Sequence, residues 1–101
     1  MSGALASLSD QVQAVSDIYA ANFGIDCDGD WALLKLQEEL GELVQAHLKL
    51  TGRGRGGAAP EARADEAADV LCMLLLYCRQ HGVDLEAAVD RKWLAYLKEP
   101  A

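Results

Sequence analysis

The sequence predicts an all-α fold, a bundle of four helices that forms a single domain over residues 1–101. Three observations lead to this prediction. Hydrophobic residues recur at helical spacing in four stretches, and segments with glycine or proline separate those stretches. Apolar and polar residues nowhere alternate as they do in a strand. A chain of 101 residues also suits one small domain, whose core we expect over about residues 10–97.

The first expected helix is capped by Ser7 or Ser9 and runs to about Phe23, where Gly24 ends it. Its hydrophobic side chains keep helical spacing. They are Leu8, Val12, Val15, Ile18 and Tyr19.

The second expected helix covers residues 31–50, with Asp30 as its N-cap. Its apolar stripe consists of Leu33, Leu36, Leu40, Leu43, Val44 and Leu50. The third begins at Pro60, because proline is favoured in the first turn, and continues to about Gln80 before the stop at Gly82.

Asp84 is expected to cap a fourth helix, which runs from Leu85 to about Leu97. The residues expected to face inward from it are Leu85, Ala88, Val89, Trp93 and Leu97.

The third helix is apolar on every side from Ala67 to Cys78. Such a helix is normally buried all round, and a protein this thin needs a second copy to bury it. We therefore expect a homodimer or homotetramer that assembles through this helix.

Two acidic pairs are the most informative feature of the sequence. Glu39 and Glu42 lie three residues apart on the second helix with Glu38 beside them, and Glu66 and Asp69 repeat the spacing on the third. Residues three apart share a helix face, so antiparallel packing of the two helices brings four carboxylates together. Oxygen ligands on rigid elements suit a hard divalent ion, Mg²⁺ or Mn²⁺ before Zn²⁺.

Either pair alone is more often a solvated helix face than a site. The second pair makes a site more probable than a solvated face, because Asp69 directly precedes the apolar run from Val70 to Cys78. An unpaired carboxylate at the edge of a buried element is costly, which favours a functional site.

These motifs resemble those of the all-α nucleoside triphosphate pyrophosphohydrolase superfamily, and within it the small MazG-like proteins. The resemblance extends from Trp31 and Lys35 through both acidic motifs to Lys92 and Trp93. It implies Mg²⁺-dependent hydrolysis of a (deoxy)nucleoside triphosphate to the monophosphate and pyrophosphate, possible nucleotide-pool cleaning, and assembly as dimers or tetramers.

The resemblance also implies roles for individual residues. The metal ligands are expected to be Glu39, Glu42, Glu66 and Asp69. Glu38 either supports the metal ligands from behind or orients or deprotonates the attacking water, and Lys35 is able to pair with a carboxylate or a phosphate. Lys92 is expected at a phosphate.

Four further residues are candidates for substrate binding. Trp31 and Trp93 are each either core residues or platforms for a base, and the sequence does not decide between these roles. Arg53 and Arg55 lie in a glycine-rich loop that either closes over a triphosphate or merely links two helices.

Composition limits the other possibilities. A formal net charge of −7 argues against binding to nucleic acid. The longest apolar run is too short to cross a bilayer and no signal peptide is evident, so we expect no membrane partner. Three cysteines without disulfide or metal spacing suggest reduced thiols and a cytoplasmic protein.

Two rival functions remain open. Phosphoribosyl-ATP pyrophosphatase shares the expected fold and metal motif in a chain of similar length. Alternatively, the chain is a non-catalytic helical dimerisation module whose acidic faces keep it in solution.

Overall fold

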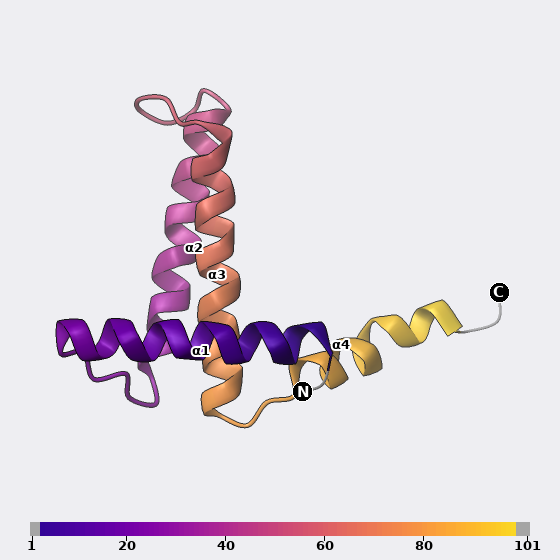
Figure 1. The fold of residues 1–101 in the computed structure, drawn as a ribbon. Helices are drawn as coiled ribbons and strands as arrows, with labels where there is room; N and C mark the ends of the chain where they lie inside the picture. The colour runs from indigo at the N-terminus through magenta and orange to yellow at the C-terminus, as the bar shows by residue number, and fades with distance from the viewer. Residues whose placement is uncertain (1–2, 99–101) are drawn as a thin grey trace.

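The computed structural model describes residues 3–98, which form four α-helices and a short 3₁₀ segment (Figure 1). The elements are α1 (Ala4–Phe23), α2 (Trp31–Leu50), α3 (Pro60–Gln80), α4 (Leu85–Lys92) and η1 (Leu94–Lys98). Over this part of the chain there is no strand, so the predicted all-α class is confirmed.

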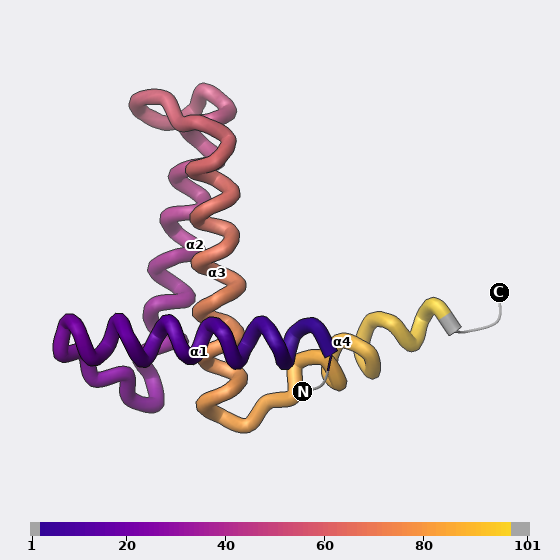
Figure 2. Tube along the Cα trace, in the orientation of Figure 1, coloured from indigo at the N-terminus to yellow at the C-terminus, as the bar shows by residue number. Residues whose placement is uncertain are grey.

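The helices are arranged around an antiparallel hairpin of α2 and α3, which form the most extensive contact in the molecule. Helix α1 crosses one end of this hairpin and packs against α3, and the loop 51–59 lies at the other end (Figure 1). The tube in Figure 2 shows α4 and η1 leading away from the hairpin as a C-terminal arm. We use that name for α4 and η1 together.

The boundaries of α2 and α3 are those that the sequence predicts. Pro60 occupies the first turn of α3, and Gly82 adopts the left-handed conformation just beyond its end, with φ of 66°. Asp84 caps α4, because its Oδ1 accepts a hydrogen bond from the Ala87 amide at 3.1 Å. Asp30 takes the N-cap position of α2, although its side chain accepts no capping hydrogen bond.

The start of α1 differs from the prediction. Neither Ser7 nor Ser9 caps the helix, which begins at Ala4, and Ser9 is 2% exposed inside it. The cap comes from another element, since the Leu5 amide donates to Glu86 Oε1 of α4 at 2.6 Å. A cap supplied from so far along the chain satisfies the first turn without a local serine.

The C-terminal arm also differs from the prediction. Helix α4 ends at Lys92, and the chain continues as the 3₁₀ segment rather than as one helix to Leu97. Trp93 and Leu97, predicted to face inward, are 69% and 83% exposed. They lack a core to enter because α4 packs mainly on η1.

The buried apolar core is small and lies where α1 crosses the hairpin and along the α2–α3 contact. Its members are Ala32, Ala46, Leu75, Leu76 and Cys78. The radius of gyration is 16.3 Å, against about 13 Å for a compact chain of this size. One chain therefore leaves an unusual amount of apolar surface in water.

Part of that surface lies on the flank of the hairpin. Leu33, Leu40 and Val44 of α2 are about half exposed, and Leu71 of α3 is 40% exposed. The apolar stripe of α2 is therefore only partly buried in one chain, and α3 is not covered on every side. Burial of α3 by a second copy stays a prediction.

None of the described helices is both long enough and apolar enough to span a membrane.

Candidate active site

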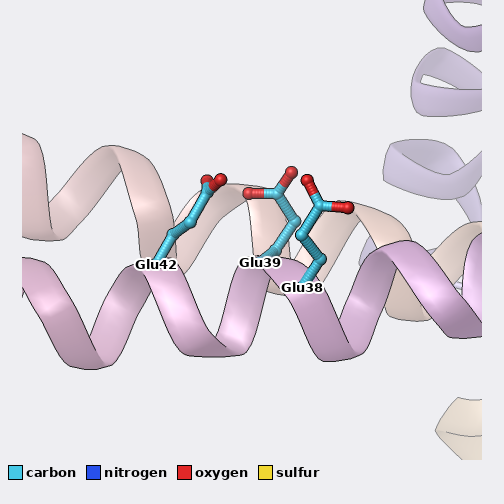
Figure 3. Close-up of side chains that lie close together, drawn as sticks. All are labelled: Glu38, Glu39 and Glu42. Atoms are coloured by element: carbon cyan, nitrogen blue, oxygen red, sulfur yellow. The ribbon is translucent and has the colours of Figure 1, made fainter.

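The α2–α3 hairpin brings together the acidic residues that the sequence singles out. Glu38, Glu39 and Glu42 form one group and Glu39, Glu66 and Asp69 a second, with ligand oxygens within 4.8 Å of one another in each group. Figure 3 shows the three α2 side chains projecting to the same side of the helix. Glu39 belongs to both groups and lies at the centre of this acidic cluster.

Burial makes the cluster unusual. The Glu39 side chain is 9% exposed, and neither its Oε2 nor the Oε2 of Glu66 has a hydrogen-bond partner. Buried carboxylate oxygens without partners are strongly disfavoured, so these two oxygens are suited to accept a cation or a proton.

The pKa values show that the charged forms of these carboxylates are disfavoured. Burial first, and then the close Glu42 carboxylate with Asp69 and Glu66 beyond it, raises the pKa of Glu39 from 4.5 to about 7. Burial and the neighbouring Glu42 also raise the pKa of Glu66. Negative charge is thus crowded around Glu39, the one buried carboxylate of the cluster.

The donor set of this cluster fits a hard divalent cation. All the candidate ligands are carboxylate oxygens on two rigid, packed helices, and two of these oxygens are buried and unpaired. A cation among them would relieve the repulsion that raises the two pKa values.

Lys35 lies at the edge of the cluster, one turn before Glu39. Its Nζ is 3.1 Å from Glu38 Oε1, and this hydrogen bond is the main reason why the pKa of Lys35 is raised. The sequence-based pairing of Lys35 with a carboxylate is therefore present, and it leaves Glu38 exposed at the mouth of the site.

A cavity of about 590 Å³ adjoins the cluster, between α1 and the hairpin. Trp31, Lys35, Glu39 and Asp69 line it on the hairpin side. The remaining lining residues come mostly from α1 and from the apolar part of α3: Gln11, Val12, Val15, Ser16, Tyr19, Ile25, Cys72, Met73 and Leu76. Its size is that of a small-molecule site, and most of its exposed lining is apolar.

Sequence reasoning missed the contribution of α1 to this cavity. Tyr19 lines it and is 48% exposed, whereas its helical spacing is that of an ordinary core residue. An aromatic residue followed by a glycine-terminated turn gives no local sign that the helix will cross over an acidic cluster.

Four of the predicted substrate-binding positions are not brought to the cluster of their own chain. Arg53 and Arg55 lie in the loop at the far end of the hairpin (Figure 1), where Arg53 Nε donates to Thr51 Oγ1 at 3.1 Å. Lys92 and Trp93 lie on the C-terminal arm, away from the hairpin (Figure 1). Trp31, by contrast, does line the cavity.

Comparison with protein families gives an identification. Residues 9–91 match the family model described as phosphoribosyl-ATP pyrophosphohydrolase, a match that includes all of α2 and α3 and most of α1 and α4. The chain belongs to the phosphoribosyl-ATP pyrophosphohydrolase family. This family is part of the MazG-like all-α nucleoside triphosphate pyrophosphohydrolase superfamily, so the superfamily expected from the acidic motifs is confirmed.

The matching family is the one that the sequence analysis ranked as a rival to the small MazG-like proteins. Membership indicates a pyrophosphohydrolase that cleaves a phosphoanhydride bond of a nucleotide. Searches of curated proteins and of solved structures returned no match.

Proposed function

We propose that the protein hydrolyses a nucleoside triphosphate group to the monophosphate and pyrophosphate, with phosphoribosyl-ATP as the leading substrate. The observation that carries the proposal is the acidic cluster, with two buried and unpaired oxygens on Glu39 and Glu66, beside a cavity of small-molecule size. The family match over residues 9–91 supports both the bond that is cleaved and the choice of substrate.

The cation in this proposal is Mg²⁺, for which Mn²⁺ can substitute. Glu39, Glu42, Glu66 and Asp69 would hold it, because they supply the oxygens that converge between α2 and α3. When bound, the ion would neutralise phosphate charge and polarise the phosphoanhydride that is cleaved.

The chain's own residues would do the rest. Glu38 is exposed at the mouth of the cluster and is the carboxylate placed to accept a proton from the attacking water. The water oxygen bonds to phosphorus, the bridging P–O bond breaks, and its electrons leave with pyrophosphate. Lys35, at 3.1 Å from Glu38, is placed to interact with the phosphate chain.

The cavity would hold the base and sugar. Tyr19 of α1 and Trp31 of α2 both line it, and most of the other lining side chains are apolar. Stacking on aromatic rings binds any base, so this arrangement positions a nucleotide without fixing which one.

A plain nucleoside triphosphate is the second candidate, and one observation favours it. Lys35 is the single cationic residue among those that line the cavity in the described part of the chain. Phosphoribosyl-ATP carries one more phosphate than ATP, and this cavity offers that phosphate no second positive charge. A second copy could supply it.

A substrate panel tests the proposal. Pyrophosphate release is measured with phosphoribosyl-ATP, dCTP, dTTP and dUTP, each with Mg²⁺ and with EDTA. We expect turnover only with Mg²⁺ and the highest kcat/KM for phosphoribosyl-ATP. Preference for a deoxynucleotide would favour the second candidate, and no Mg²⁺-dependent pyrophosphate release from any substrate would contradict both.

A further inference from the structure

A second, smaller cavity adjoins the candidate active site at the end of the hairpin that α1 crosses (Figure 1). Its volume is about 170 Å³, and Ser16, Trp31 and Leu76 line both cavities. The remaining lining residues of the smaller cavity are Gln13, Cys27, Ala32 and Gln80. A molecule bound against Trp31 in the larger cavity therefore has the smaller one beside it.

The smaller cavity has a polar but uncharged lining. Its longest polar side chains are Gln13 and Gln80, and none of the described residues that line it is Lys, Arg, Asp or Glu. The electrostatic potential around it is negative, since burial first, and then three nearby aspartates, raises the pKa of the Cys27 thiol. Such a cavity disfavours a phosphate and favours a group that donates hydrogen bonds.

The two glutamines keep hydrogen-bond acceptors available. Gln13 Nε2 donates to Asp17 Oδ1 at 2.8 Å, and Gln80 Nε2 donates to the Cys27 carbonyl oxygen at 3.3 Å. A carboxylate and a carbonyl only accept, so the nitrogen of each side-chain amide must face them, and this fixes the orientation of both amides. No described group donates to either Oε1 atom. Each glutamine therefore has a free acceptor oxygen.

The distance along α2 suits a nucleotide. Trp31 and Ala32 lie seven or eight residues before Glu39, which is about 10–12 Å along the helix axis. An extended nucleotide spans a comparable distance from its α-phosphate to the far edge of its base. With the phosphates at the acidic cluster and the base stacked on Trp31, the base edge reaches the smaller cavity.

We infer that the smaller cavity selects an amino base over a keto base, with the Oε1 atoms of Gln13 and Gln80 accepting hydrogen bonds from the exocyclic amino group. Adenine and cytosine carry that group. Uracil, thymine and hypoxanthine carry a carbonyl oxygen there, which would face two further acceptors without a hydrogen between them. The inference rests on the proposed function for the position of the phosphates, and it adds the class of base that the site accepts.

Both candidate substrates of the adenine series agree with this inference. Phosphoribosyl-ATP retains the exocyclic nitrogen of ATP. Gln80 is exposed, which leaves room beside it for a substituent on the ring.

Two matched substrate pairs test the selection. ATP and ITP differ in the exocyclic group of a purine, and CTP and UTP differ in that of a pyrimidine. We expect the wild type to prefer the amino member of each pair by roughly 10–100-fold in kcat/KM for pyrophosphate release with Mg²⁺. Gln13→Ala and Gln80→Ala should each move that ratio toward 1, because each removes one acceptor.

Gln45→Ala is the matched control, since Gln45 is an exposed glutamine of α2 that lines neither cavity. It should leave the ratio unchanged. A merely structural role of Gln13 and Gln80 would lower kcat/KM for both members of a pair by the same factor, and that result would overturn the inference. A wild type without preference in either pair would overturn it too.

A binding experiment tests the same contact without turnover. ¹⁵N-labelled protein is titrated with AMP and with IMP in the presence of Mg²⁺, and NMR follows the side-chain amide signals, which the three alanine variants assign. We expect AMP to shift the signals of Gln13 and Gln80 but not that of Gln45, and IMP to shift them less. The absence of these shifts would overturn the inference. A protein that releases no pyrophosphate but shows the expected shifts would contradict the proposed function and support the base contact.

Discussion

The acidic hairpin and the C-terminal arm differ in how far their side chains are buried. In the hairpin, α2 and α3 make the most extensive contact of the molecule, and even a carboxylate as central as Glu39 is buried there. In the arm, α4 and η1 pack mainly on each other, and Trp93, Tyr96 and Leu97 remain in water. The hairpin buries its central residues within one chain, although Leu40 and Val44 on its flank stay half exposed, whereas α4 has no buried residue at all.

The two regions destabilise the folded chain for different reasons. In the hairpin, Glu39 and Glu66 repel neighbouring carboxylates and have oxygens without hydrogen-bond partners. In the arm, large apolar side chains are exposed to water. A cation and a substrate would relieve the first, and a second copy the second, so binding and assembly are expected to stabilise the same protein from its two ends.

The largest expected effect is on the hairpin. Replacing Glu39 by Gln or Asp69 by Asn should lower kcat/KM by on the order of 100-fold or more, because each removes a charged oxygen from the proposed cation site. Circular dichroism should show unchanged helicity. Titration with Mn²⁺ followed by electron paramagnetic resonance should show weakened ion binding in both variants. Retention of most activity by both would contradict the site.

The next effect contrasts one leucine from each region. Leu75→Ala should destabilise the protein by about 2–5 kcal/mol, because Leu75 of α3 is fully buried. Leu97→Ala should change stability by less than about 0.5 kcal/mol in dilute, monomeric protein. Urea denaturation at low and high protein concentration separates the two. A concentration-dependent cost for Leu97→Ala would reveal its burial in an oligomer.

A smaller effect concerns pH. The pKa of Glu39 is raised to about 7 in the folded protein from 4.5, so the native state binds the proton more tightly than the unfolded chain does. Metal-free stability should therefore fall as pH rises from 4.5 to 7, by roughly 1–3 kcal/mol from this group. The difference in denaturation free energy between wild type and Glu39→Gln isolates this contribution. Excess Mg²⁺ should reduce it, and a difference that does not vary with pH would contradict the burial of a charged Glu39.

The same contrast explains what the sequence could reveal. The bounds of α2 and α3 follow from local signals, such as Pro60 at the start of α3 and Gly82 after its end. The convergence of carboxylates also follows locally, because Glu39 and Glu42 share one helix face and the antiparallel hairpin supplies the other. Helix period and breakers were enough to predict these features.

The features that were missed depend on contacts between distant segments. Glu86 accepts a hydrogen bond from the first turn of α1, and α1 lines one side of the cavity with residues from Gln11 to Tyr19. The residues adjacent to Glu86 and Tyr19 in the sequence give no sign of either contact. The predicted inward orientation of Trp93 was wrong. Apolar spacing identifies the hydrophobic face of a helix, but it does not identify what packs against that face.

The smallest expected effect lies where the two regions are joined. Glu86 Oε1 accepts the Leu5 amide at 2.6 Å and so ties α4 to the first turn of α1. Glu86→Ala should cost about 1–2 kcal/mol, because it removes a charged cap from a helix N-terminus. Glu86→Gln retains an acceptor and should recover part of that loss. Glu61→Ala, an exposed acid in the first turn of α3, is the matched control. The specific readout is the hydrogen exchange rate of the Leu5 amide, which should rise in Glu86→Ala while amides in the middle of α2 stay protected. Unchanged exchange at Leu5 would mean that the arm is not anchored to α1, and that its direction is set only by whatever it binds.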